Sequence, residues 1–364
     1  MRVVVGLSGG VDSAVAALLL RREGHEVQGL FMQNWDAEDR YCTSAEDFQD
    51  ARSVAAELGI PLHRVNFAAQ YRAQVFEQFL SDYRAGRTPN PDVLCNREIK
   101  FGVALDYARR LGAECFATGH YAQLLPGSQS IELHKAVDAG KDQSYFLHRL
   151  ERAQLEAARM PLGGLFKAEV RELARKGGLP VYDKPDSTGI CFIGERPFRE
   201  FLASFIRCDP GVIETPEGEI LGTHAGLPFY TLGQRQGLEL GGRRGHAEQP
   251  WYVAEKDLRR NVLIVVQHAE HPLLMSTTLE TGRFHWLGPR ADRAPRICAK
   301  VRYRQPDQPV EVFPLEEGRV RLTFEHAQRA VTPGQYAVLY EGSRCLGGAV
   351  IDRFERAPVA SAAA

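Results

Sequence analysis

The chain has 364 residues, of which 44% are hydrophobic and 25% charged, and its formal net charge is −1. This composition is typical of a globular protein, and the length predicts two or three domains. No apolar run is long enough to cross a membrane, and the run over residues 2–7 is too short and too early for a signal peptide, so we expect a cytoplasmic protein with no membrane partner.

Seven cysteines are scattered along the chain without a CxxC pair. An odd number without regular spacing argues against a secreted disulfide scaffold. The missing CxxC pair argues against a zinc ribbon and against a self-contained iron–sulfur motif.

The first predicted elements are a strand and a helix joined by the loop GLSGGVDS. Residues Val3–Val5 are typical of a buried parallel strand, and Val15, Leu18 and Leu19 recur at helical spacing after the loop. The loop comprises Gly6, Leu7, Ser8, Gly9, Gly10, Val11, Asp12 and Ser13. Because the first turn of a helix leaves N–H groups without partners, and glycines let the main chain approach a ligand, this loop predicts a phosphate site. It contains no Walker lysine, and a tight turn with a helix cap remains the alternative.

Strands and helices then alternate along the chain. The predicted strands cover 26–32, 62–67 and a run ending near Gly119, and the predicted helices cover 44–58, 73–83 and 101–111. This alternation predicts an α/β fold with a doubly wound parallel sheet, in which ligands bind at the carboxyl ends of the strands. Met32 and Gly119 lie at two such ends.

From about residue 211 the sequence changes to short alternating runs. We therefore expect a small β-rich middle domain and a C-terminal β-barrel after the α/β domain. The predicted bounds are 1–205, 206–270 and 271–356 for the three domains, and 357–364 for a disordered tail.

Two cysteine segments complete the candidate catalytic residues. In RTPNPDVLCNREIKF, two X-Pro bonds hold the chain extended before Asp92 and Cys95, and a helix beginning near Asp92 would put both on one face. A cysteine near a helix N-terminus has more thiolate, although a buried structural cysteine is the alternative. Cys191 lies in DKPDSTGICFIGERPF, and sequence spacing alone does not bring it to Cys95. An iron–sulfur cluster on these three residues is possible but is not favoured by their spacing.

The segment Arg283–Arg304 has a local charge of +6, although the whole chain is nearly neutral. Within it, RICAKVRYR alternates apolar and basic residues, so one strand would send Lys300 and Arg302 to one face as a cationic stripe for RNA. Tyr303 could stack on an exposed base if the strand is bent. A solvated strand face is the alternative interpretation.

The loop SGGVDS after an N-terminal strand resembles the PP-loop of ATP pyrophosphatases, which cleave ATP between the α and β phosphates and adenylate an oxygen. Together with TPNPDVLCN, ATGHYA, KDQSYFL and DSTGICFIGE, it is similar to the bacterial tRNA-specific 2-thiouridylases from residue 2 to about residue 355. The resemblance implies an enzyme that uses ATP, with Mg²⁺ on its phosphates, to make 2-thiouridine at wobble position 34 of tRNA.

The resemblance also implies roles for matched residues. Cys191 would carry a persulfide delivered by a sulfur-relay protein or a cysteine desulfurase, Cys95 would be the partner nucleophile, and Asp92 would act as acid or base. The ATP site would comprise the loop 6–13 with Met32 and Gly119. The residues matched to tRNA contacts are Asn90, Pro91, Asp92, Lys141, Asp142, Gln143, Arg302 and Tyr303.

Two other classes of function compete with this hypothesis. An amide-forming PP-loop ligase that uses glutamine would need an ammonia-releasing domain with its own cysteine. A non-catalytic nucleotide- or RNA-binding module would leave Asp12, Asp92 and both loop cysteines unexplained. Pyrophosphate release that depends on tRNA rather than on glutamine distinguishes the three.

Overall fold

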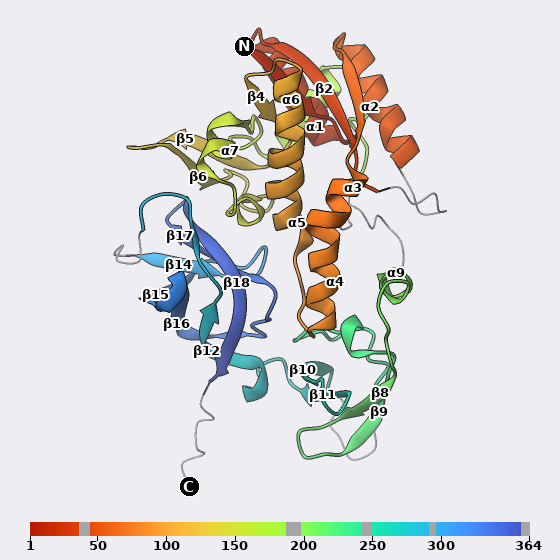
Figure 1. Cartoon of the computed structure of the whole chain (residues 1–364), viewed down its shortest axis with the longest axis vertical. Coiled ribbons are helices and arrows are strands. Elements are labelled where there is room, and N and C mark those ends of the chain that lie inside the picture. The colour runs from red at the N-terminus through yellow and green to blue at the C-terminus, as the bar shows by residue number, and fades with distance from the viewer. Residues whose placement is uncertain (36–43, 187–197, 242–248, 291–295, 358–364) are drawn as a thin grey trace.

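The computed structural model describes residues 1–35, 44–186, 198–241, 249–290 and 296–357. Figure 1 shows the chain as an α/β part, a small β part and a barrel-like β part. Cys191, and the tail over 358–364 that was predicted to be disordered, lie outside the described residues. None of the described helices is long and apolar enough to span a membrane.

The α/β part is built on a parallel sheet with strand order β3–β2–β1–β4–β7. Its strands are β1 (Arg2–Gly6), β2 (Glu26–Gln33), β3 (Leu62–Asn66), β4 (Cys115–Ala117) and β7 (Ala158–Arg159). Val3, Val4 and Val5 are completely buried because helices cover both faces of the sheet. The predicted doubly wound sheet is confirmed.

The two faces of the sheet have separate cores. Val3 and Val5 pack in the core formed with α1 (Val11–Arg22), α2 (Ser44–Leu58) and α8 (Lys167–Lys176). Val4 packs in the opposite core, whose helices lie between β3 and β4, directly before β7, and after α8. Those helices are α3 (Ala68–Tyr71), η1 (Arg72–Phe76), α4 (Glu77–Arg84), α5 (Pro91–Leu94), η2 (Cys95–Ala104), α6 (Leu105–Arg110), α7 (Arg152–Ala157) and α9 (Phe198–Ala203).

The helix predicted over 101–111 begins earlier, at Pro91. Asn90 is extended, with φ of −123° and ψ of 92°, and Pro91 occupies the first helical position, where its missing N–H costs nothing. The helix runs through α5, then through the wide π-type turns of η2, and ends as α6. The predicted start at Phe101 was wrong because the i→i+5 turns of a π-helix do not follow the 3.6-residue period.

The middle part is a four-stranded sheet of order β10–β11–β8–β9 with its own apolar core. Its strands are β8 (Gly211–Glu214), β9 (Ile220–His224), β10 (Trp251–Asp257) and β11 (Val262–Gln267), and the short helical turns beside them are η4 (Leu227–Phe229) and η5 (Pro272–Leu274). It is the small β-rich middle domain that the alternating runs predicted.

The last part is a closed barrel, because β12 pairs with both β16 and β18. Its strands are β12 (Met275–Thr281), β13 (His285–Trp286), β14 (Ile297–Lys300), β15 (Gln308–Pro314), β16 (Val320–Arg329), β17 (Tyr336–Glu341) and β18 (Arg344–Arg356), with a short turn η6 (Glu316–Gly318). A hairpin from the α/β part, β5 (Ala122–Pro126) and β6 (Ile131–Lys135), pairs with β18 and joins the barrel to the α/β part.

The predicted cationic stripe does not form, because β14 ends at Lys300 and residues 301–304 turn away. Lys300 Nζ lies 3.6 Å from Asp142 Oδ2 in the contact with the α/β part. The guanidinium of Arg302 donates to the carbonyls of Leu232 and Ala330, which belong to the middle part and the barrel. These two cations hold domains together and do not share an exposed face.

We therefore expect Arg302→Ala to lower thermal stability. The substitution leaves carbonyl acceptors at a domain contact without their charged donor, a loss of roughly 1.5–3 kcal/mol. Thermal unfolding measures it, and Arg304→Ala, at an exposed neighbouring position, is the control. An Arg302→Ala protein with unchanged stability but weaker, less salt-dependent tRNA binding would restore the surface interpretation.

Candidate active site

The loop after β1 is held in shape by its own hydrogen bonds. Ser8 N donates to Ser13 Oγ at 3.2 Å, and Ser13 Oγ donates to the Gly10 carbonyl at 3.1 Å. Gly9 has a φ of +79°, and a Cβ there would lie 2.4 Å from the carbonyl oxygen of Asp47 in α2, so only glycine fits. Gly10 occupies the N-cap position of α1 but has no side chain that could accept hydrogen bonds from the first turn. The first-turn N–H groups of α1 are therefore available to an anion.

This loop lies where the strand order of the parallel sheet reverses. The chain passes from β1 to β2 and β3 on one side and returns through β4 on the other side of β1. Crevices at such positions bind ligands in doubly wound folds. Gly119, after β4, lies so close to α1 that a Cβ there would come within 2.7 Å of the Ser13 nitrogen, and Met32 Cε lies 3.4 Å from the position of a Cβ on Gly6. The predicted nucleotide residues therefore gather at one edge of the sheet.

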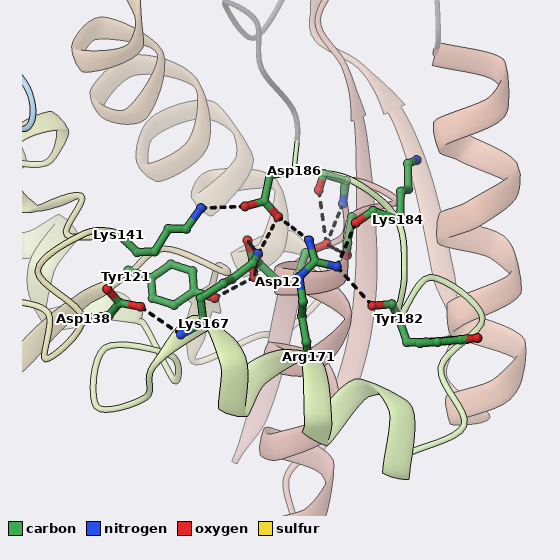
Figure 2. Close-up of polar contacts among 12 residues, drawn as sticks. Asp12, Tyr121, Asp138, Lys141, Lys167, Arg171, Tyr182, Lys184 and Asp186 are labelled. Atoms are coloured by element: carbon green, nitrogen blue, oxygen red, sulfur yellow. Dashed lines mark hydrogen bonds and ion pairs between the residues drawn. The ribbon is translucent and has the colours of Figure 1, made fainter.

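A lysine from α8 reaches the first turn of α1. Lys167 Nζ lies 2.7 and 2.8 Å from the two carboxylate oxygens of Asp12, and the hydroxyl of Tyr121 donates to the same carboxylate at 2.8 Å. Lys167 Nζ also lies 2.7 Å from Asp186 Oδ1. Figure 2 shows these four side chains converging beside the amino end of α1.

Asp186 gathers three cations at this position. Besides Lys167, its carboxylate accepts hydrogen bonds from Lys141 at 2.6 Å and from Arg171 at 3.1 Å. Burial raises the pKa of Asp186, but the hydrogen bonds from Lys141 and Lys167 outweigh it and lower that pKa to about 2. Three cations and the three carboxylates of Asp12, Asp138 and Asp186 lie beside the loop, so the cations stand where a polyanionic ligand on the first turn of α1 would meet them.

The candidate nucleophile lies one helical turn after Asp92. Cys95 begins η2 and has 0% exposure, whereas Asp92 is half-buried in α5. The predicted helix start near Asp92 is confirmed, so the i, i+3 spacing places both residues on one face. Cys191 lies outside the described residues, and its distance from Cys95 stays untested.

The helix that carries Cys95 is joined to the loop region through Lys100. Lys100 Nζ lies 3.5 Å from His120 Nε2, and the hydroxyl of Thr118 lies 2.8 Å from His120 Nδ1. Burial, followed by the charge of Lys100, lowers the pKa of His120 well below its usual value, so the imidazole is neutral near pH 7. Because Gly119 touches α1 and His120 touches η2, the cysteine helix and the phosphate loop border the same region.

The three residues of the KDQ motif have inward contacts. Lys141 binds Asp186. Asp142 is 5% exposed and accepts hydrogen bonds from the backbone of Ala136 and Ser144. Gln143 accepts a hydrogen bond from Tyr121 N at 2.9 Å. The carboxylate of Asp142 is thus enclosed by protein, which conflicts with its predicted contact with tRNA in this conformation.

The other predicted tRNA residues lie in two places. Asn90 and Pro91 begin the helix of Asp92, and Pro91 is buried there. Tyr303 packs against the ring of Phe146 with centroids 4.4 Å apart. Tyr303 therefore belongs to the contact between barrel and α/β part, and Asn90 remains beside the candidate catalytic residues.

Sequence reasoning missed Lys167, Asp186 and Tyr121. Lys167 is separated from Asp12 by 155 positions, and no motif surrounds it, so only the packing of α8 on α1 reveals the pair. Tyr121 and Asp186 lie inside two of the matched motifs, ATGHYA and DSTGICFIGE, where the letters alone gave them no role.

No group of three or more His, Cys, Asp or Glu side chains among the described residues is arranged to hold a metal ion. Asp12, the carboxylate in the loop, is engaged by Lys167. Predicted Mg²⁺ would thus depend on nucleotide phosphates for most of its oxygen ligands. An iron–sulfur cluster that includes Cys191 would involve a residue outside the described ones, so this alternative stays untested.

Three family models match the chain in succession. They are the tRNA methyl transferase HUP domain over residues 1–195, the tRNA methyl transferase PRC-barrel domain over residues 199–267 and the aminomethyltransferase beta-barrel domain over residues 276–351. The parallel sheet and the four-stranded sheet fall within the first two spans, and the third span covers most of the closed barrel, so the predicted fold class is confirmed.

Curated relatives match nearly the whole chain. A tRNA-specific 2-thiouridylase of Dichelobacter nodosus is 56% identical over 96% of this chain and 94% of its own length. That of Methylobacillus flagellatus is 53% identical over 96% of this chain and 98% of its own length. A solved 4-thiouridine synthetase–RNA complex with bound ATP is 21% identical, with a TM-score of 0.38 over 56% of this chain and 50% of that chain, a likeness too low to support an inference. The relatives show that the chain belongs to the tRNA-specific 2-thiouridylase family.

Proposed function

We propose that this protein is a tRNA-uridine 2-sulfurtransferase that uses ATP to thiolate uridine 34 at the wobble position. The observation that carries the proposal is the uncapped amino end of α1 with Lys167 and two further cations beside it, at the reversal point of the sheet. That arrangement suits a triphosphate. The region is bordered by the helix of Asp92 and Cys95, which supplies a carboxylate and a thiol for chemistry on a base.

The proposed reaction has two stages. Uridine O2 attacks the α-phosphorus of ATP and pyrophosphate leaves, which turns a poor leaving group into a good one. The terminal sulfur of a persulfide on Cys191 then attacks C2, and AMP leaves with the former O2. Asp92 is the proposed acid or base at the target base.

The second cysteine releases the product. The Cys95 thiolate attacks Sγ of Cys191, the inner sulfur. The bond between this Sγ and the sulfur on the base then breaks, and its electron pair stays with the 2-thiouridine sulfur. A Cys95–Cys191 disulfide remains, and a cellular dithiol must reduce it before the next cycle. The persulfide itself comes from a sulfur-relay protein or a cysteine desulfurase.

The nucleotide is assigned to loop 6–13, Met32 and Gly119. Its phosphates would meet the N–H groups of α1 and the cations around Asp186, and Mg²⁺ on these phosphates would neutralise charge as pyrophosphate departs. The anticodon would enter beside Asn90 and the start of α5. We also assign tRNA contacts to Lys141, Gln143, Arg302 and Tyr303, the last two in addition to their contacts between domains.

Incubation of unmodified tRNA with the protein, ATP, Mg²⁺, a cysteine desulfurase with cysteine as the persulfide source and a dithiol reductant, followed by nucleoside mass spectrometry, tests the proposal. We expect 2-thiouridine at position 34, together with AMP and pyrophosphate whose release requires tRNA. Glutamine-dependent pyrophosphate release without thiolation would favour an amide ligase. Binding of ATP and tRNA without release of pyrophosphate would favour a non-catalytic module.

Gly10→Val is expected to lower tRNA-dependent pyrophosphate release by about a hundredfold, because a side chain there displaces the phosphates from the loop. Gly10 has a negative φ, and a Cβ there meets only Ser8 Oγ at 3.5 Å, so the protein should keep its unfolding temperature. Gly9→Val is a poorer test, since it would clash with Asp47 whatever the ligand. Unchanged pyrophosphate release in Gly10→Val would contradict the loop assignment.

A further inference from the structure

The barrel contacts the segment that leads into the helix of Asp92 and Cys95. Between β16 and β17, the turn TPGQ comes against residues 87–89 of the α/β part. Thr88 N donates to the Pro333 carbonyl at 3.0 Å. In return, the side-chain amide of Gln335 donates to the carbonyls of Thr88 at 2.9 Å and Pro89 at 3.3 Å. One side chain of the barrel thus bridges the two peptide units just before Asn90.

This segment depends on an external donor. Pro89 and Pro91 have no N–H, so the segment cannot complete a regular ladder of hydrogen bonds through its own backbone. Thr88 is only 9% exposed, which limits access of water to its carbonyl. Gln335 therefore supplies the Thr88 and Pro89 carbonyls with a donor that the backbone of their own segment lacks.

The turn is itself fixed to the barrel. Gly334 N donates to the Ile351 carbonyl at 3.0 Å, and Ile351 N donates to the Gln335 carbonyl at 2.7 Å. Gly334 has a φ of +93°, and a Cβ there would lie 2.9 Å from the Thr88 carbonyl oxygen. The close approach of the two backbones thus requires glycine, and it brings the Gln335 amide to Thr88 and Pro89 from a turn that is hydrogen-bonded to β18.

Only Asn90 separates this contact, which ends at Pro89, from the first residue of α5. Pro89 is followed by Asn90 in an extended conformation and by Pro91 at the first helical position. The backbone conformations of Asn90 and Pro91 are both restricted, because proline fixes its own φ and limits the φ and ψ of the residue before it. A shift of the Thr88 and Pro89 carbonyls would therefore move the start of α5 and, with it, Asp92 and Cys95.

We propose that Gln335 is a positioning residue for the reaction: through its two hydrogen bonds the barrel fixes the start of α5 and so the placement of Asp92 and Cys95. This inference rests on the proposed function, since it takes Asp92 and Cys95 as the reacting groups. It makes the barrel part of the catalytic apparatus and not only a surface for tRNA.

The test compares the wild type, Gln335→Met and Gln308→Met in the assay for 2-thiouridine described above. Methionine keeps the length of glutamine without a donor, and Gln308 is a barrel residue whose side chain bonds only within the barrel, to Pro306 and Gln328. For Gln335→Met we expect kcat to fall about ten- to a hundredfold, with KM for tRNA and ATP within about twofold, because a displacement of about 1 Å costs rate more than binding. Gln308→Met should match the wild type.

A second readout does not need turnover. The rate at which iodoacetamide modifies Cys95, followed by peptide mass spectrometry, should rise several-fold in Gln335→Met, because its helix start is no longer held. Gln335→Asn, which keeps the amide but shortens it by one methylene, should show a smaller rise and replaces Gln335→Met if that variant does not fold.

The outcomes separate the two claims. A wild-type protein that makes no 2-thiouridine refutes the proposed function, and Cys95 alkylation still tests the contact. If wild type is active, an unchanged kcat in Gln335→Met, an equal loss in Gln308→Met, or a loss expressed only in KM and unfolding temperature would overturn the positioning role.

Discussion

Cys95→Ser is expected to lower the rate of 2-thiouridine formation by at least about a thousandfold, because serine is a far weaker nucleophile toward a persulfide. The substitution should remove the nucleophile without disturbing the packing around it. Cys95 is completely buried at the junction of α5 and η2, and serine differs from it by one atom. Affinity for tRNA should stay within about twofold, since a buried side chain contributes little to the surface that RNA meets.

The matched control is Cys298→Ser, a half-buried cysteine on β14, which should retain full activity. Cys191→Ser should also stop thiolation, and after incubation with a sulfur donor only proteins that keep Cys191 should carry the added sulfur in peptide mass spectrometry. Added sulfur on Cys95 in the Cys191→Ser protein would mean that the two roles are reversed. Full thiolation by Cys95→Ser would remove Cys95 from the mechanism.

The local parts of this fold could be predicted because one short pattern determines each of them. The apolar run Val3–Val5 requires a buried strand, and its alternate side chains do enter two different cores. The glycines that follow require a loop without side chains, and Gly9 adopts the positive φ that only such a residue tolerates easily. Strand, loop and helix N-terminus together specify an anion site before any tertiary contact is known.

Contacts between distant segments could not be predicted in the same way. Alternation in ICAKVRYR suggested one strand, but the polar partners of Lys300 and Arg302 lie in other domains and pull the two side chains in different directions. The motif KDQ offered charged groups for RNA, yet Asp142 is enclosed by backbone N–H groups of its own hairpin region. Which polar residue faces solvent is decided by tertiary packing, and that information is absent from the local pattern.

Lys167→Ala is expected to reduce tRNA-dependent pyrophosphate release by roughly 10²–10³-fold, the usual cost of losing a preorganised charged donor at a reacting centre. Lys167 Nζ lies within 2.8 Å of both oxygens of Asp12 and within 2.7 Å of Asp186 Oδ1. Without it, two carboxylates face the place proposed for the triphosphate. Repulsion from them should raise KM for ATP as well as lower kcat.

Two further variants determine why Lys167 matters. Lys176→Ala lies on the same helix α8, where its ammonium is exposed and contacts Glu172 at 3.3 Å, so it should behave as wild type. Lys167→Met combined with Asp186→Asn removes one charge of each sign and keeps the local balance. If Lys167 only neutralises Asp186, the double variant should recover pyrophosphate release. If its charge stabilises the departing pyrophosphate, as we expect, the double variant should stay as slow as Lys167→Ala. Normal pyrophosphate release in Lys167→Ala itself would show that the ion cluster stabilises the fold and takes no part in the reaction.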